Sequence, residues 1–228
     1  TIFLNTFILC FSPNKKLLYL LKIGIEMIGI KTLVLEKIRK MPRGTIFFID
    51  DFIELGSLGS VRLALMELKK EGLILRPARG IYCYPKIRSE YSGFITPTAE
   101  SVADALAAKE RVRIIPYGDQ SAYRLGLTGL QLSNLKYLTD GPSRVINLTE
   151  GKKIFFNHTS EVKMFDFCND TMQMVSSAIR VLTDECLDGE KKRIIHKHLR
   201  SVPDNEFMKD ITIPPAWVGE IILDIWNN

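Results

Sequence analysis

Residues 57–85 read SLGSVRLALMELKKEGLILRPARGIYCYP, and this stretch decides the fold of the first part of the chain. Ser57 is a favourable N-cap for a helix over 58–71, and Gly72 can end that helix as a C-cap glycine. The apolar residues that fall on one side of this helix are Val61, Ala64, Leu65 and Leu68. The stretch therefore predicts a helix with one apolar face, followed at once by another element.

The other side of the same helix is largely basic. Its residues are Gly59, Arg62, Met66, Lys69 and Lys70, and Leu63 also points outward. A tight apolar stripe, a small residue near the start and outward basic residues are typical of a helix that lies in a DNA major groove. The side chain of Leu63 fits a contact with a thymine methyl group or simple packing on a neighbour, and both interpretations stay open.

A short hairpin is expected directly after this helix, with strands over 73–76 and 81–85. Gly80 in the turn is free to adopt positive φ. Arg76 and Arg79 flank the tip of the hairpin. A hairpin that follows a recognition-type helix is the wing of a winged helix, and its arginines would reach phosphates or an adjacent minor groove.

The residues before this stretch complete the pattern. A helix is expected over 30–41, a β-prone run over 45–48 and a second short helix over 50–55. We therefore expect a winged helix-turn-helix domain over 30–90. The residues predicted to contact DNA are Arg43, Ser57, Ser60, Arg62, Met66, Lys69, Lys70, Arg76, Arg79 and Tyr82. The alternative is a winged helix that docks proteins and has no sequence-specific DNA binding.

The charge distribution agrees with a nucleic-acid partner for the first domain. Residues 31–90 hold 12 Lys and Arg against 7 Asp and Glu, whereas residues 91–228 hold 16 against 18. A basic domain joined to a near-neutral one is typical of a nucleic-acid binder that carries a second module. A solvated basic face is the simpler interpretation of the same numbers.

The second domain is expected over 96–228 and mixes helices with strands. Strands over 144–148 and 152–156 should pair as a hairpin, with further strands over 114–115 and 136–138. The helices are expected over 98–109, 121–127, 172–187, 190–199 and 216–226. The whole chain is therefore predicted to be α+β, with a winged helix followed by a mixed α/β domain.

No residue pattern indicates catalysis or a cofactor. The four cysteines are scattered without a CxxC pair, and His196 and His198 do not share a helix face. Asp140 and Arg144 form a conceivable catalytic pair, but Asp140 before Gly141 is better explained as turn chemistry. We expect neither an enzyme nor a metal or other cofactor.

The N-terminal extension, residues 1–29, fits no targeting class. Its apolar run over 2–11 is too short to span a bilayer, and no basic segment precedes it. Met27 stands just before the first patterned helix. We expect Met27 to be the natural start, with residues 1–26 as upstream read-through. The alternative is an amphipathic helix that packs on a partner or a membrane surface.

Several motifs resemble the AbiEi-like antitoxins of type IV toxin–antitoxin systems. In the first domain they are Pro42-Arg43-Gly44, Leu55-Gly56-Ser57, Gly72-Leu73-Ile74 and Ala78-Arg79-Gly80-Ile81-Tyr82. In the second they are Thr96-Pro97-Thr98-Ala99-Glu100, Pro116-Tyr117-Gly118 and Leu138-Thr139-Asp140-Gly141-Pro142-Ser143-Arg144. The resemblance covers about residues 30 to 200.

The resemblance implies a bacterial cytoplasmic regulator with two activities. The winged helix would bind inverted repeats of double-stranded DNA in its own promoter. The protein would also neutralise a nucleotidyltransferase-like toxin without needing a stable complex, and no membrane would be involved. Gly59 and Leu63 depart from the polar residues expected of a base-reading helix.

Overall fold

The computed structural model describes residues 29–88, 93–129, 134–149, 151–183 and 186–228. Met27, and with it the expectation for residues 1–26, lies outside the described residues. The chain divides into two compact units between Pro97 and Thr98.

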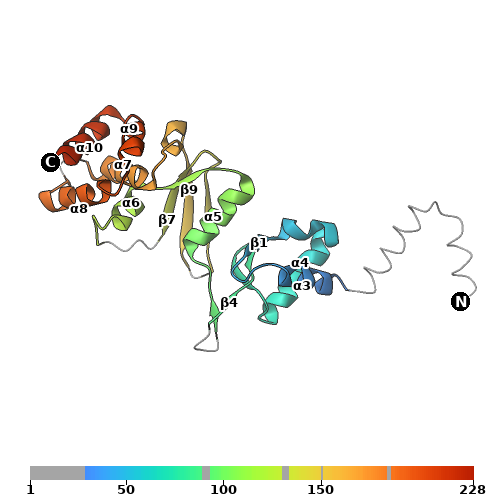
Figure 1. The fold of residues 1–228 in the computed structure, drawn as a ribbon. Helices are drawn as coiled ribbons and strands as arrows, with labels where there is room; N and C mark the ends of the chain where they lie inside the picture. Colours follow the sequence, from blue (N-terminus) through green and yellow to red (C-terminus); the bar gives the residue numbers. More distant parts are fainter. Residues whose placement is uncertain (1–28, 89–92, 130–133, 150, 184–185) are drawn as a thin grey trace, which may run out of the picture. The chain divides into compact units, whose positions relative to one another are not determined.

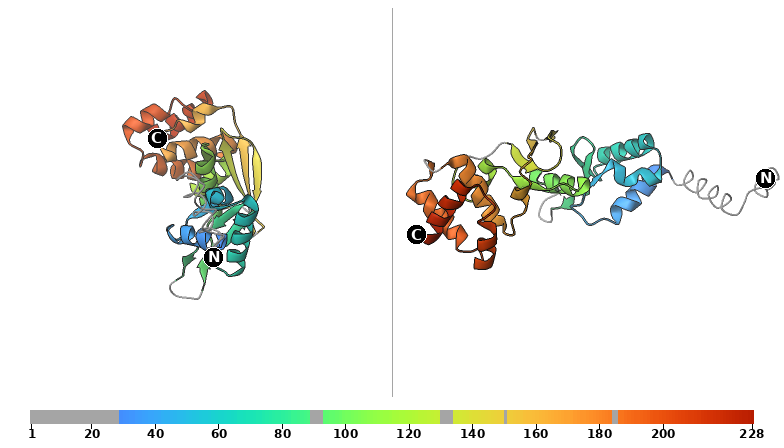
Figure 2. Two further views of the ribbon diagram at one scale, coloured as in Figure 1. Left: turned by 90° about the vertical axis from the view of Figure 1, so that its right-hand side faces the viewer. Right: turned by 90° about the horizontal axis from the view of Figure 1, so that it is seen from above.

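The first unit is a winged helix-turn-helix (Figure 1, Figure 2). Its elements are α3 (Ile30–Arg39), β1 (Ile46–Phe48), η1 (Ile49–Leu55), α4 (Leu58–Lys70), β2 (Leu75–Ala78) and β3 (Ile81–Cys83). The three strands form one antiparallel sheet in the order β1-β3-β2. The predicted order of helices and strands, including the hairpin after α4, is confirmed.

The core of this unit joins the helices to the sheet. Phe47 of β1 lies at its centre, with its ring 5.4 Å from that of Phe52 and 5.9 Å from that of Tyr82. The other buried members come mainly from α3 and α4: Val34, Ile38, Val61, Ala64, Leu65, Leu68 and Ile74. Because β3 is the middle strand, it pairs with both β1 and β2.

The predicted second helix is a 3₁₀ helix, and this geometry decides which of its side chains are buried. A period of three residues places Ile49, Phe52 and Leu55 on the side that packs against the core. Ile53 is consequently 59% exposed. The Asp51 carboxylate accepts the backbone N–H of Phe48 at 2.7 Å and so caps the start of this helix.

A second, small hairpin follows the winged helix and was not predicted. It pairs β4 (Lys86–Ile87) with β5 (Phe94–Ile95) in an antiparallel ladder. Ile87, Phe94 and Ile95 are all exposed. Strands of two residues are too short to show an alternating pattern in the sequence, which explains why this hairpin escaped prediction.

The second unit contains a four-stranded sheet and helices. Its elements are α5 (Ala99–Glu110), β6 (Ile114–Pro116), α6 (Gly118–Arg124), β7 (Leu135–Thr139), β8 (Arg144–Asn147), β9 (Lys153–His158), η2 (Val162–Phe165), α7 (Asp170–Leu182), α8 (Gly189–Leu199), α9 (Asp204–Asp210) and α10 (Ala216–Asn227). The strand order is β6-β7-β9-β8. The predicted hairpin of β8 and β9 is confirmed, and β9 also pairs in parallel with β7. The predicted α+β class is therefore confirmed.

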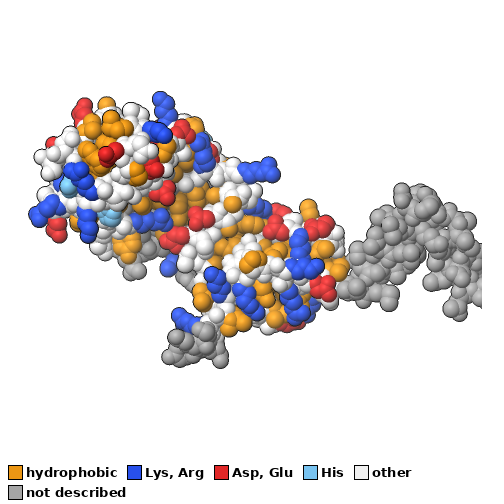
Figure 3. All heavy atoms as spheres, viewed as in Figure 1, with side chains coloured by type: hydrophobic (Ala, Val, Ile, Leu, Met, Phe, Trp, Pro, Cys, Tyr) orange, Lys and Arg blue, Asp and Glu red, His pale blue; other side chains and the backbone are white. Residues whose placement is uncertain are grey.

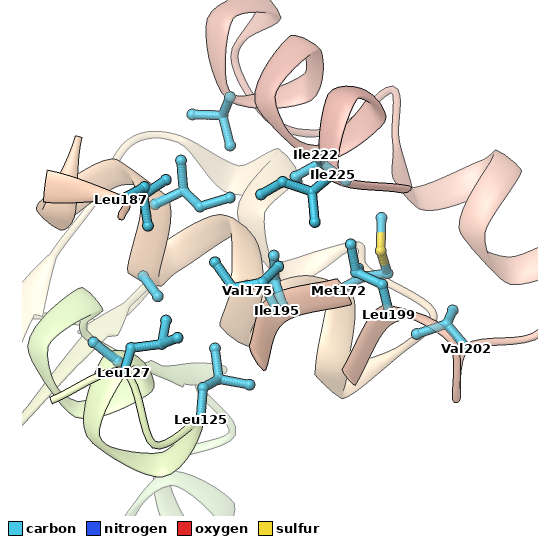
Figure 4. Close-up of a cluster of buried hydrophobic side chains, with 14 of the residues drawn as sticks. Leu125, Leu127, Met172, Val175, Leu187, Ile195, Leu199, Val202, Ile222 and Ile225 are labelled. Atoms are coloured by element: carbon cyan, nitrogen blue, oxygen red, sulfur yellow. The ribbon is translucent and has the colours of Figure 1, made fainter. Parts of the chain in front are cut away.

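Five helices of the second unit, α6 to α10, contribute to one apolar core (Figure 4). Leu125 and Leu127, directly after α6, point toward Val175 of α7 and Ile195 of α8 in this view. Other members of the core are Met172, Ile179, Leu199, Phe207, Val218, Ile222 and Ile225. This unit therefore has a hydrophobic core of its own, independent of the winged helix.

Candidate nucleic-acid interface

The orientation of α4 is set by its apolar face. Val61, Leu65 and Leu68 have no exposed surface, and Ala64 is 4% exposed. Burial of one Val or Leu side chain contributes about 1.5–3 kcal/mol to the stability of the fold. The stabilisation from this buried face is therefore larger than the cost of exposing apolar residues on the other side of the helix. The opposite face is thereby directed outward, with Arg62, Lys69 and Lys70 exposed as predicted.

The start of α4 is fixed by two serines from the predicted site. Ser57 Oγ accepts the backbone N–H of Ser60 at 3.2 Å, and the two hydroxyl oxygens lie 2.8 Å apart. An N-cap of this kind satisfies one of the free N–H groups at the helix end. Ser57 and Ser60 therefore define where the outward face of α4 begins.

The acidic residues of α4 are held away from this outward face. Glu67 and Glu71 both form ion pairs with Lys31 of α3, at 3.7 Å in the case of Glu67. The hydrogen bond to Glu71 is the main reason why the pKa of Lys31 is raised. The pairing partly neutralises both carboxylates on the side facing α3, and the outward face keeps its positive charge.

The wing is the turn at Arg79 and Gly80 between β2 and β3. Gly80 has a φ of +79°, as its predicted role requires, and Arg79 is exposed. The Arg76 guanidinium lies 5.8 Å from the centre of the Tyr82 ring. Arg76 Nε is buried and has no hydrogen-bond partner among the described residues. Arg79 thus offers a free charge, whereas the stem of Arg76 is held against the sheet.

Two residues that were predicted to contact DNA do not lie on the surface formed by α4 and the wing. Tyr82 is only 4% exposed because it belongs to the middle strand, so its ring supports the sheet and offers no surface to DNA. Arg43 precedes β1, and the first residue of β1 pairs with the last residue of β3. Arg79 precedes the first residue of β3, so the two arginines lie at opposite ends of this ladder. Its guanidinium donates to the Pro85 carbonyl at 3.1 Å and lies 4.7 Å from the Tyr84 ring centre.

The sequence did not reveal the role of Lys31 in holding the two glutamates. Glu67 and Glu71 are four residues apart and thus recognisable as neighbours on one helix face. Their partner, Lys31, stands 40 residues before Glu71 in the sequence. Only the packing of α3 against α4 brings Lys31 close to the two glutamates. The remaining predicted residues, Arg62, Met66, Lys69, Lys70 and Arg79, are exposed.

The conceivable catalytic pair of the second unit is not formed. Asp140 accepts hydrogen bonds from Arg113, from its backbone N–H at 2.8 Å and from its Nε at 2.9 Å. The side-chain hydrogen bond from Arg113 is the main reason why the pKa of Asp140 is lowered. Arg144 instead forms an ion pair with Glu110. Asp140 therefore acts as a structural residue that joins two loops.

The second unit also contains a cleft. It has a volume of about 310 Å³ and is lined by residues that include His158, Ser177 and Arg180. Both guanidinium amino groups of Arg180 donate to Glu161, at 2.8 and 3.1 Å, and His158 Nδ1 lies 2.9 Å from the Gly141 carbonyl oxygen. The main charge in the cleft is thus already neutralised. Within the described residues, no group of histidines, cysteines and carboxylates has the arrangement of a metal site.

The order of elements and the three-stranded antiparallel sheet define the fold of the first unit as a winged helix-turn-helix. A family model matches residues 33–207, and the chain therefore belongs to this family, which is described as a family of unknown function (DUF6088). Comparison with curated proteins found no match. Among the described residues, none of the helices has both the length and the apolar character needed to cross a membrane.

Proposed function

We propose that this protein binds double-stranded DNA through the outward face of α4 and the wing, and that it acts as a transcriptional regulator of its own promoter. The observation that carries this proposal is the division of α4 into a fully buried apolar face and an exposed face with Arg62, Lys69 and Lys70. An exposed helix of this kind next to a basic turn suits insertion into a major groove, with the turn on the backbone.

The two parts of this surface should contribute differently. Arg79 in the wing is expected to contact phosphates, which gives affinity without sequence preference. Arg62 stands in the first half of α4, where recognition helices contact base edges. A bidentate contact of Arg62 with guanine would contribute roughly 1–3 kcal/mol of discrimination against other bases.

A gel-shift titration at two salt concentrations tests the proposal, with a duplex that contains the protein's own promoter. Arg79→Ala should weaken binding to every sequence and reduce the salt dependence. Arg62→Ala should mainly reduce the preference for the promoter over an unrelated duplex. Arg193→Ala, an exposed arginine of α8 in the second unit, is the matched control. Weak, salt-insensitive binding by all four proteins would reject DNA binding.

A second candidate function is docking of a protein on the same surface. Leu63 and Met66 are 52% and 44% exposed on the outward face of α4, and this observation favours it. A protein-docking surface predicts that the wild-type chain has no salt-sensitive affinity for duplex DNA. The same titration therefore separates the two candidates.

We further propose that the chain is the antitoxin of a type IV toxin–antitoxin system and acts in the bacterial cytoplasm. The support is the sequence resemblance to AbiEi-like antitoxins, together with a second unit that has its own core and lacks the basic excess of the first. Co-expression of residues 96–228 with a nucleotidyltransferase-like toxin encoded next to it should restore growth. Rescue only by chains that retain the winged helix would contradict this division of labour.

A further inference from the structure

The outward face of α4 has uncharged residues next to Arg62. Gly59, Arg62, Leu63 and Met66 follow the spacing i, i+3, i+4 and i+7, so they lie on one face of the helix. Leu63 is 52% and Met66 is 44% exposed. Contact with water alone does not explain two large apolar side chains beside a glycine on an exposed helix face. We therefore expect a partner to cover these side chains.

The described residues give Gly59 no structural role inside the unit. Among them, a Cβ at this position would meet only Ser57 Oγ, at 3.9 Å, and the backbone φ does not lie in the left-handed region. Glycine within a helix lowers its stability relative to alanine. Neither packing nor backbone conformation among the described residues requires glycine here, so its small size leaves room for an approach from outside the protein.

The charges around these residues indicate what approaches. Arg62, Lys69 and Lys70 lie on the same side of α4, and none forms an ion pair with a described residue. Figure 3 shows Lys and Arg side chains interspersed with hydrophobic ones on the visible face of the first unit. A polyanion that presents small apolar groups fits both the charged and the apolar side chains of this face. In the major groove of duplex DNA, the C5-methyl group of thymine has this chemistry.

We propose that α4 recognises thymine by its methyl group, with Leu63 and Met66 as the contacting side chains and Gly59 as the gap that lets the helix approach the bases. This inference rests on the proposed binding of duplex DNA. It makes DNA rather than RNA the partner, since uracil lacks the methyl group and the major groove of an RNA duplex is too narrow for side chains to read. Arg62 would read a neighbouring guanine.

The first experiment selects the duplex and then removes its methyl groups. The full chain is incubated with duplexes that carry a randomised centre, and the enriched sequence is synthesised with each dT replaced by dU in turn. We expect thymines in the enriched sequence, and a loss of affinity of about fourfold for each contacted methyl group. Equal affinity for the dT and dU duplexes would overturn the inference and leave DNA binding intact. Absence of any salt-sensitive binding would overturn both.

The second experiment assigns the contacts to residues. Leu63→Ala and Met66→Ala should each abolish the difference between dT and dU at one position. Leu223→Ala is the matched control, because Leu223 is 41% exposed on α10 in the second unit. It should keep the whole difference. If Leu63→Ala and Met66→Ala both discriminate dT from dU as the wild type does, the assignment to these residues is wrong.

Gly59→Ala gives a test in which stability and binding change in opposite directions. Alanine favours the helix and finds free space, so the Tm should rise. Affinity for the enriched duplex should fall, because the added methyl group stands between α4 and the bases. A variant with a raised Tm and unchanged affinity would show that no close approach occurs at this position.

Discussion

Three arginines of the second unit and four cations on the α4 and wing surface of the first unit differ in how they are used. In the second unit Arg113 binds Asp140 and Asp166, Arg144 binds Glu110, and Arg180 binds Glu161. In the first unit Arg62, Lys69, Lys70 and Arg79 are exposed and form no ion pair with described residues. The first set joins loops and helices within the fold, whereas the second remains available to an anion from outside. Placement of the charges, more than their number, separates structural from binding residues.

The largest expected effect comes from disrupting the hydrophobic core of the first unit, which carries the free cations. Phe52→Ala deletes a ring with no exposed surface beside Phe47 and should cost about 3–5 kcal/mol of unfolding free energy. The winged helix should then unfold and DNA binding should be lost. Urea denaturation followed by circular dichroism, with a gel shift on the same sample, measures both.

Ile53→Ala is the control for that variant, because it removes an apolar side chain one residue away that is 59% exposed. Its effect on the unfolding free energy should stay within about 0.5 kcal/mol. A large loss of stability from Ile53→Ala would mean that the 3₁₀ geometry of η1 is wrong.

An intermediate effect is expected when the free cations themselves are removed. Lys69→Gln with Lys70→Gln should make the slope of log affinity against log salt shallower by about two, since each phosphate contact contributes roughly one. The unfolding free energy should change by less than about 1 kcal/mol per residue, the range for charges at a helix C-terminus. Fluorescence anisotropy over a salt series measures the slope.

Arg113→Ala should show the opposite behaviour. Its ion pairs with Asp140 and Asp166 are partly exposed and screened by solvent, so stability should fall only slightly and the salt slope should not change. If Arg113→Ala flattens the slope as much as the lysine variant does, the distinction between structural and binding cations does not hold.

The smallest effect concerns pH and Asp140. Because the pKa of Asp140 is lowered in the folded state by Arg113, its stabilising contribution is present above the ordinary carboxyl pKa near 3.8. It is lost as the pH falls through the lowered value. Asp140→Asn should therefore be less stable than the wild type at pH 7, by less than about 1 kcal/mol, and this difference should shrink below pH 4. Urea midpoints at pH 7 and pH 3 measure it. A constant difference would contradict the ion pair.

Most of the fold of the first unit was predictable because its signals are local. Ser57 and Gly72 bound α4, Gly80 permits the wing turn, and the apolar spacing of α4 specifies its buried face. The 3₁₀ form of η1 was missed, because a buried Phe52 fits either an α-helix or a 3₁₀ helix. Only the exposure of Ile53 in the structure distinguishes the two helix types. α9 and the β4–β5 hairpin were also missed, because seven and two residues show too little periodicity.

The candidate site was predictable in part. The outward residues of α4 and Arg79 follow from helical geometry and turn chemistry. Tyr82 was misplaced because the sequence does not tell which strand of three lies in the middle. Arg43 was predicted to contact DNA, although the strand register puts it at the opposite end of the sheet from the wing.

By itself the sequence determined the winged-helix order, the basic and apolar faces of α4, and the turn at Gly80, because caps, periodicity and glycine act over a few residues. Only the tertiary structure decided that Lys31 holds Glu67 and Glu71, that Arg113 rather than Arg144 holds Asp140, and that Tyr82 is buried. Each of these depends on which distant segments pack together. Electrostatic and packing energies depend on distance in space, which separation along the chain does not specify.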